Sequence, residues 1–233
     1  LDGAATGGYS WYYPRTFLAP DGRVFGIDTG GKMYYVDTTG GGSITPAGQL
    51  DSTLVGQPST VAMFLPSKIL LISANSDAST VVDFSGGAPV VTPAASLSSR
   101  RAWANATVLA DGRVLVTGGS AVANTLTNVN NHAEIWNPQT DTWTLGASGA
   151  RPRLYHSSAL LLPDGSVLVS GGGGTPASPV TNLHAEIYHP PYLYDESGQL
   201  APRPTIDLAP DILAIGEAFD IVAGASDQIA RVT

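Results

Sequence analysis

The stretch Asp111-Gly112-Arg113-Val114-Leu115-Val116-Thr117-Gly118-Gly119 decides the fold, because it recurs along the chain. Two clear copies and one degenerate copy lie at 21–27, 164–172 and 67–73. The steps between copies are 46, 44 and 53 residues, counted from Gly22 through Lys68 and Gly112 to Gly165. A repeat of this length is typical of a four-stranded β-propeller blade.

Each copy has the same internal order. An apolar run precedes an Asp-Gly turn that requires positive φ, and a second apolar run follows it, which indicates a pair of buried strands. Third strands are expected at 33–36, 81–84, 133–138 and 185–190, and outer fourth strands at 43–45, 89–91 and 142–144. No window has a convincing helical period with caps, so the sequence predicts an all-β chain.

The composition agrees with stacked blades. The 233 residues include 27 glycines and 17 prolines, and charged residues make up 13% against a usual value of about 25%. Small residues let strands crowd together near a propeller axis, and strands covered on both faces need few charges. The net charge of -8 argues against nucleic acid as a partner, and no apolar stretch is long enough to span a bilayer.

The repeat ends at Tyr194, and the residue pattern after it is different. A polar turn at 195–198 and prolines at 202 and 204 indicate a domain boundary, and 206–222 has short alternating strands. We expect propeller blades in 1–194, at about 9–50, 58–97, 103–149 and 155–194. Residues 201–233 would begin an immunoglobulin-like sandwich. Four blades leave a propeller ring open, so we expect the chain to be a segment of a longer protein.

Four motifs together give the sequence a family resemblance. They lie at 11–25, 101–109, 153–157 and 185–194. The chain resembles the galactose oxidase and glyoxal oxidase family of copper radical oxidases, especially bacterial members. This resemblance implies a partial kelch-like propeller, about four blades of a seven-bladed ring, followed by the start of an early-set domain. It also implies a secreted, extracellular enzyme that oxidises an alcohol or aldehyde with O2 and releases hydrogen peroxide.

The resemblance implies a copper (Cu2+) site with two tyrosine and two histidine ligands. Tyr155 would be the axial ligand and catalytic base, and His156 an equatorial ligand. Imidazole nitrogen and phenolate oxygen suit Cu(II), and a phenolate can accept the proton of a substrate hydroxyl. The family's radical tyrosine is cross-linked to cysteine, and this Cys-Tyr cofactor is not encoded here because the chain has no cysteine.

The resemblance places the other two ligands outside this chain. We therefore expect the isolated chain to be inactive and to depend on remaining segments of the same protein. Its small-molecule partners would be O2 and a small alcohol, aldehyde or carbohydrate. Trp11, Tyr12, Tyr13 and Arg15 match a family segment that faces the pocket, so they are candidate substrate-binding residues, although simple blade packing also explains them.

Other conspicuous side chains have structural explanations. We expect Trp103, Trp136 and Trp143 to pack in cores or at blade edges. The aspartates at 21, 111 and 164 recur beside glycine and are expected to form turns. The glutamates at 134 and 186 would make hydrogen bonds between blades and are weak evidence for glycosidase chemistry. His132, His184 and His189 are expected at the surface or in packing.

Two classes of function remain open from the sequence. In the first, the chain is part of a copper radical oxidase. In the second, it is a non-catalytic propeller module that binds carbohydrate or protein, or a component of a structural assembly. A cysteine and a tyrosine in preceding blades, with a histidine in the sandwich, would favour the oxidase.

Overall fold

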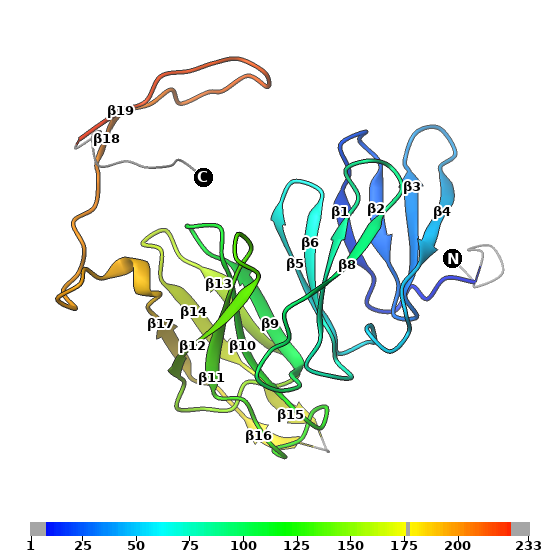
Figure 1. Cartoon of the computed structure of the whole chain (residues 1–233), viewed down its shortest axis with the longest axis horizontal. Coiled ribbons are helices and arrows are strands. Elements are labelled where there is room, and N and C mark those ends of the chain that lie inside the picture. The colour runs from blue at the N-terminus through cyan, green and yellow to red at the C-terminus, as the bar shows by residue number, and fades with distance from the viewer. Residues whose placement is uncertain (1–7, 176–177, 225–233) are drawn as a thin grey trace. The chain divides into compact units, whose positions relative to one another are not determined.

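The structure, a computed structural model, describes residues 8–175 and 178–224. The chain divides into two units, Leu1–His189 and Pro190–Thr233. In the first unit, antiparallel sheets follow one another in chain order (Figure 1). Each of the first three sheets is built from consecutive strands, as expected when hairpins connect neighbours.

Three of these sheets have four strands each. The first consists of β1 (Arg15–Leu18), β2 (Val24–Ile27), β3 (Lys32–Asp37) and β4 (Ser43–Gln49). The second consists of β5 (Thr60–Leu65), β6 (Lys68–Ile72), β7 (Ser79–Asp83) and β8 (Val90–Ala94). The third consists of β9 (Ala102–Val108), β10 (Val114–Ser120), β11 (His132–Asn137) and β12 (Thr142–Ser148).

The fourth sheet has three strands among the described residues. It contains β13 (Ser157–Leu161), β14 (Val167–Gly171) and β17 (Ala185–Tyr188), in that order. A separate hairpin of β15 (Gly173–Thr175) and β16 (Ser178–Thr181) lies between β14 and β17 in the sequence. The four sheets confirm the repeat and the propeller blades that it predicted, and they agree with the kelch-like propeller that the family resemblance implies.

The hairpin turns between first and second strands carry the conformation that the sequence requires. Gly22, Gly112 and Gly165 have φ values of 85°, 81° and 81°. The preceding aspartates close these turns, as expected; for example, Asp164 Oδ1 accepts hydrogen bonds from the Ser166 amide at 2.9 Å and hydroxyl at 2.6 Å. An aspartate side chain that bonds the backbone two residues later favours a turn.

The degenerate copy differs in one detail. Ser67, with φ 63°, occupies the left-handed backbone position that we had aligned with Lys68. The sequence alignment of this copy was therefore displaced by one residue. Lys68 instead begins β6 and pairs with Leu65 across the turn. The corrected steps, from Gly22 through Ser67 and Gly112 to Gly165, are 45, 45 and 53 residues.

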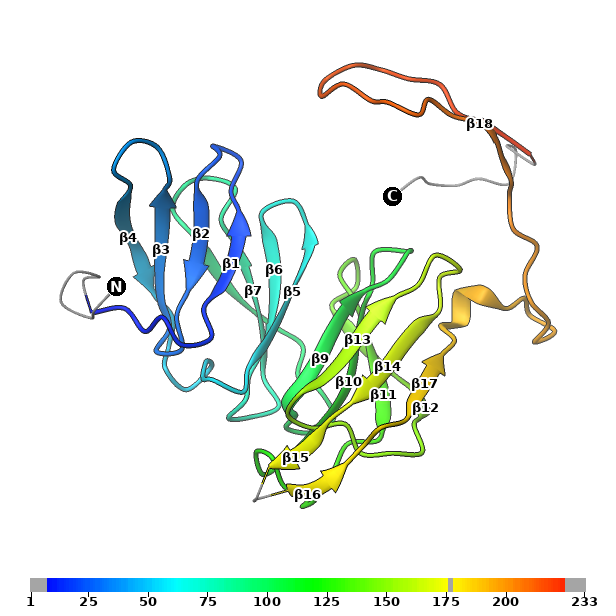
Figure 2. The same cartoon turned by 180° about the vertical axis from the view of Figure 1, so that it is seen from behind.

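The core lies between the faces of successive sheets. Phe25 of the first sheet stacks on Phe84 after β7, with ring centroids 4.3 Å apart. Phe64 of the second sheet meets Trp136 of the third edge-on at 5.0 Å, and both residues belong to one buried cluster. Burial of each such ring contributes about 2–3 kcal/mol. The first strands also meet: β9 contacts both β5 and β13 (Figure 2).

Two of the three tryptophans occupy packing positions, as expected. Trp136 is buried in the core, and Trp143 packs against the same cluster. The Trp143 indole nitrogen donates to the Ala95 carbonyl at 2.7 Å, so its polar edge is satisfied. Trp103 does not follow this pattern and is described with the site below.

The second unit contains a short β-pair. β18 (Ile206–Leu208) pairs antiparallel with β19 (Val222–Ala223). A single 3-10 turn, Pro191–Leu193, opens the unit. The predicted boundaries at 194 and 201 and the assignment to a sandwich stay predictions, and residues 225–233 of the predicted sandwich lie outside the described residues.

The all-β class is confirmed. Among residues 8–175 and 178–224, the 3-10 turn at Pro191–Leu193 is the one helical element. No helix in this part of the chain is long and apolar enough to cross a membrane.

We predict that Gly22→Ala destabilises the first unit by about 1–2 kcal/mol, because an L-residue at φ 85° is strained while its Cβ would meet no atom within 4 Å. Gly41→Ala is the matched control: its Cβ also meets nothing within 4 Å, and its φ lies outside the left-handed region. Chemical denaturation of both variants measures the difference. Equal stabilities would contradict the strain argument.

Candidate functional site

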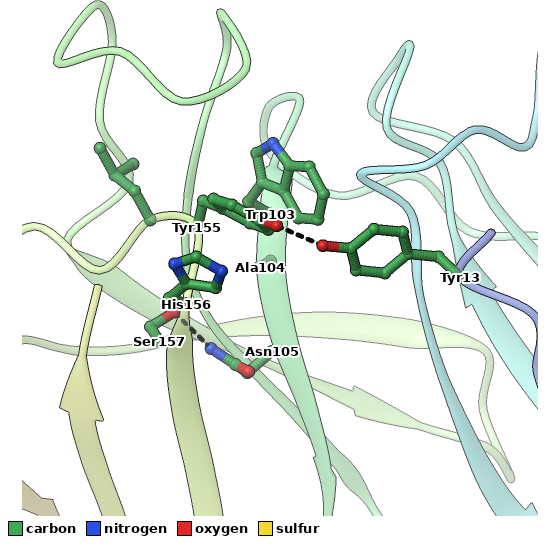
Figure 3. A pocket seen from close by; sticks show the side chains of 8 residues that line it. Tyr13, Trp103, Ala104, Asn105, Tyr155, His156 and Ser157 are labelled. Atoms are coloured by element: carbon green, nitrogen blue, oxygen red, sulfur yellow. Dashed lines mark hydrogen bonds between the residues drawn. The ribbon is translucent and has the colours of Figure 1, made fainter. Parts of the chain in front are cut away.

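A pocket of about 220 Å³ lies where the first strands of the sheets begin (Figure 3). Tyr13 precedes β1, residues 103–105 lie in β9, and residues 154–157 lead into β13. The pocket combines aromatic, imidazole, amide and hydroxyl groups. It is lined by Tyr13, Trp103, Ala104, Asn105, Leu154, Tyr155, His156 and Ser157.

Tyr155 lies at the centre of an aromatic cluster. Its ring centroid is 4.3 Å from the Trp103 ring and 3.7 Å from the His156 ring, with the His156 plane inclined by only 29°. The Tyr155 hydroxyl shares a hydrogen bond with the Tyr13 hydroxyl (Figure 3). Tyr13, from a distant part of the sequence, therefore meets the adjacent pair Tyr155 and His156 in one small space.

The Tyr13–Tyr155 contact affects the electrostatics of the site. The hydrogen bond to Tyr155 raises the pKa of the Tyr13 phenol, and its partial burial acts in the same direction. A phenol that donates to another phenol loses this bond when it ionises, so the neutral form is favoured. The contact with Tyr155 therefore favours the neutral form of Tyr13.

A polar contact closes the floor of the pocket. The Asn105 amide nitrogen donates to the Ser157 hydroxyl at 2.8 Å. Because Asn105 belongs to β9 and Ser157 to β13, this bond joins the third and fourth sheets beneath His156 (Figure 3).

The expectation that Trp103 packs only in a core or at a blade edge is wrong. Trp103 lines the pocket, and the register of the strands explains why. Ala104 pairs with Gly118 in the third sheet, and Ser157 pairs with Gly171 in the fourth. The residues just before these pairs are Trp103 and His156, with φ values of 64° and 67°.

Trp103 and His156 therefore occupy equivalent positions of two repeats. A repeat alignment anchored on Gly118 and Gly171 would have found this, because it places Trp103 opposite His156. An alignment anchored on Arg101 and Arg153 hides the equivalence. Trp103 follows Arg101 by two residues, whereas His156 follows Arg153 by three. Asn105, Leu154 and Ser157 carried no separate signal in the sequence.

Backbone contacts fix the segment that carries Tyr155 and His156. The Gly119 amide donates to the Arg153 carbonyl at 2.7 Å, and the Gly173 amide donates to the Tyr155 carbonyl at 3.0 Å. A Cβ at Gly171 would lie 2.9 Å from the His156 carbonyl oxygen. The close approach of these chains explains the run of glycines after β14.

A buried arginine adds a second fixation. The Arg153 guanidinium donates to the carbonyls of Gly171 at 3.0 Å and His184 at 2.8 Å. It also forms an ion pair with Glu186 at 2.7 Å. Arginine suits this role because its planar fork presents several donors at once.

The third sheet repeats this arrangement. Arg101 forms a buried ion pair with Glu134 at 2.8 Å and donates to the carbonyls of Gly118 and His132. Glu134 also accepts from the Ser98 amide in the connection between sheets, which agrees with the expected role of the recurring glutamates. The pair is structural, and it gives no support for glycosidase chemistry.

The four candidate substrate-binding residues have different positions. Tyr13 lines the pocket. The Tyr12 ring lies edge-on to the Tyr13 ring, with the centroids 4.6 Å apart, and 64% of the surface of Tyr12 is exposed. Trp11 packs instead against Tyr9 and Tyr34, so it does not line the pocket. Their roles in substrate binding stay predictions.

Arg15 is held by backbone groups. Its guanidinium donates to the carbonyls of Tyr13, Gly56, Gln57 and Ser59, at 3.0, 2.9, 2.8 and 2.6 Å. Burial lowers the pKa of this guanidinium. Arg15 therefore supports the turn that carries Tyr13, and it is not among the residues that line the pocket.

The remaining histidines lie outside the pocket. His132 Nε2 is 3.2 Å from the Ser98 hydroxyl, and His184 and His189 are exposed. These positions agree with the expected surface or packing roles. In the described part of the chain, no three His, Cys, Asp or Glu side chains gather in a group that could hold a metal.

We predict that Glu186→Gln destabilises the fourth sheet at neutral pH. Burial alone raises the Glu186 pKa, but hydrogen bonds from the Ala150 amide and Arg153 outweigh it and leave the pKa below its ordinary value. A carboxylate with a lowered pKa stabilises the folded state above its unfolded pKa, and this contribution disappears as pH falls through the folded pKa.

The expected cost is about 1–3 kcal/mol at pH 7, and it should shrink as the pH falls below about 4. Urea denaturation at several pH values measures it. Glu196→Gln, at an exposed position of the second unit, is the control and should change little. A Glu186→Gln effect that is constant with pH would contradict the ion-pair explanation.

Comparison with known proteins agrees with this architecture. Residues 105–149 match the model of the Kelch motif. The chain is 32% identical over 205 residues to a galactose oxidase from Gibberella zeae, an alignment that covers 79% of the chain and 30% of that protein. It is 39% identical over 83 residues to the aldehyde oxidase GLOX from Vitis pseudoreticulata, covering 34% of the chain and 16% of that protein.

A solved structure supports the same relationship. It is described as a novel fungal alcohol oxidase with catalytic diversity among the AA5 family, in complex with copper. The two chains superpose with a TM-score of 0.74 and 26% identity, over 84% of this chain and 44% of the other. With the repeated four-stranded sheets, these similarities support the place of the chain in the galactose oxidase-like family of copper radical oxidases.

Proposed function

We propose that this chain supplies part of the active site of a secreted copper radical oxidase, which oxidises a small alcohol or aldehyde. One observation carries the proposal: Tyr155 and His156 lie side by side in the same pocket, against Trp103 and Tyr13. The similarity to a galactose oxidase and to a copper-bound alcohol oxidase supports it.

The donor groups of the pocket fit part of a copper site. The Tyr155 phenol and the His156 imidazole supply oxygen and nitrogen, the donor types that Cu(II) accepts. They are two ligands, and two rarely hold a specific metal on their own. We therefore assign Tyr155 and His156 as the copper ligands of this chain, with further ligands and the cross-linked cysteine contributed by sequence beyond it.

For an alcohol, the overall reaction balances without any other reactant. An alcohol RCH2OH and O2 give the aldehyde RCHO and H2O2, so two electrons and two protons pass from substrate to oxygen. An aldehyde RCHO must first take up water to form its hydrate RCH(OH)2, which O2 then oxidises to the acid RCOOH with release of H2O2. Bound copper, with a radical cofactor, would supply the electron-accepting chemistry. Tyr155 would accept the hydroxyl proton, because a positioned phenolate beside the substrate oxygen is a suitable general base.

The other residues of the pocket have supporting tasks. The Tyr13 hydroxyl gives the Tyr155 oxygen a fixed hydrogen-bond partner. Trp103 packs beside the Tyr155 ring, with the centroids 4.3 Å apart, and would limit the access of water to it. Exclusion of water strengthens the electrostatic interactions of a phenolate with its neighbours.

The second class of function has one observation in its favour. The chain contains no cysteine, so it cannot form the Cys-Tyr cofactor from its own residues. A propeller module that uses the aromatic pocket to bind carbohydrate or protein without catalysis would need none. The alternatives differ in whether copper binds.

We predict that the complete polypeptide, after copper loading, produces hydrogen peroxide with galactose, glyoxal or methylglyoxal. Tyr155→Phe should lower kcat by about 10²–10⁴-fold, since it removes the base, and His156→Ala should weaken copper binding. Peroxide release and metal content measure the two effects. His184→Ala, which alters an exposed side chain outside the pocket, is the control. Absence of copper uptake by the complete polypeptide would overturn the oxidase proposal.

A further inference from the structure

Strained backbone gathers around the pocket. Seven described residues other than glycine have positive φ, and four of them are serine, asparagine or aspartate: Ser67, Asn124, Asn128 and Asp141. The other three are Tyr13, Trp103 and His156, at 56°, 64° and 67°, and all three line the pocket. Bulky residues in this conformation cost about 1–3 kcal/mol each, so surrounding contacts must hold them there.

The contacts that hold Tyr13 start from Arg15. The guanidinium Nη1 donates to the Tyr13 carbonyl at 3.0 Å, and Nη2 donates to the carbonyls of Gly56, Gln57 and Ser59. One side chain therefore fastens the turn before β1 to the loop before β5. A partly buried guanidinium is strongly driven to keep such acceptors, because an unpaired buried charge is costly.

The same loop also holds Trp103. The Trp103 amide donates to the Pro58 carbonyl at 3.0 Å, between the carbonyls that Arg15 binds. The loop is closed on itself, since the Gly56 amide donates to the Ser59 hydroxyl at 3.0 Å and the Ser59 amide to the Gly56 carbonyl at 3.1 Å. Tyr13, through Arg15, and Trp103, through its amide, are thus both bonded to one hydrogen-bonded segment.

Both residues then meet Tyr155. The Tyr13 ring lies 5.8 Å from Trp103 and 6.5 Å from Tyr155, and its hydroxyl bonds the Tyr155 hydroxyl. Tyr13 precedes β1 of the first sheet, Trp103 lies in β9 of the third sheet, and Tyr155 precedes β13 of the fourth sheet. Without a common anchor, each sheet would have to place its own ring independently.

We propose that Arg15 is a positioning residue, which acts through the loop 56–59 to hold Tyr13 and Trp103 against Tyr155. Tyr13 then fixes the direction of the Tyr155 hydroxyl, and Trp103 fixes the plane of its ring. The catalytic consequence rests on the proposed function, but the positioning itself does not require copper. This role differs from the substrate binding that the sequence suggested for Arg15.

The test is near-ultraviolet circular dichroism of the copper-free chain. The difference between the wild-type spectrum and that of Trp103→Phe isolates the contribution of Trp103 in its aromatic surroundings. Arg15→Gln should lose about half or more of this contribution, because glutamine cannot reach four carbonyls. Arg15→Lys should lose less, because its ammonium keeps three donors.

Controls separate positioning from folding. Arg203→Gln, at an exposed position of the second unit, should leave the Trp103 contribution unchanged. Far-ultraviolet spectra show whether each variant keeps its strands. If Arg15→Gln fails to fold, Arg15→Lys decides: an intermediate loss supports the proposal, and an unchanged Trp103 contribution overturns it.

A kinetic readout distinguishes this proposal from the proposed function. In the copper-loaded complete polypeptide, a positioning role predicts that Arg15→Lys lowers kcat with little change in KM. A rise in KM at constant kcat would overturn positioning in favour of substrate binding. If the polypeptide binds no copper, the oxidase proposal fails, while the circular dichroism result still decides the role of Arg15.

Discussion

Burial of sheet faces against neighbouring sheets is the constraint on which the rest of the structure depends. The second sheet covers one face against the first sheet and the other against the third, as Phe25, Phe84 and Trp136 show in the two clusters. Stacking of this kind brings the first strands together, where β9 contacts β5 and β13. The loops before those strands are forced into one small region, and the pocket forms there.

Crowding of the first strands has a second consequence. Chains approach so closely that a Cβ at Gly118 would lie 2.4 Å from the Arg153 carbonyl oxygen. Positions next to these glycines take left-handed conformations, and Trp103 and His156 are two of them. The strained backbone of Trp103 and His156 therefore lies where the chains approach closely, beside the pocket that both residues line. Functional groups lie where the backbone is most constrained.

Three arginines donate hydrogen bonds to backbone carbonyls near the first strands. Loops that converge near the first strands leave carbonyl groups without partners from a strand ladder, and a guanidinium can satisfy several at once. Arg101 and Arg153 do so beside glutamates, as paired charges. Arg15 does so with carbonyls of Tyr13 and the loop 56–59. The first two support single sheets, whereas Arg15 joins separate ones.

The sequence by itself determined the repeat, the all-β class and the turn residues, because these depend on local periodicity and on glycine conformation. Through the family resemblance it also singled out Tyr155 and His156, which line the pocket, and their role as copper ligands stays a prediction. It did not predict that Trp103 joins them, that Trp11 lies elsewhere or that Arg15 binds loop carbonyls. Those facts depend on strand register and on which loops meet across sheets. Only the tertiary structure decides them, because residues separated by 40 to 140 positions are brought together by packing and not by any local pattern.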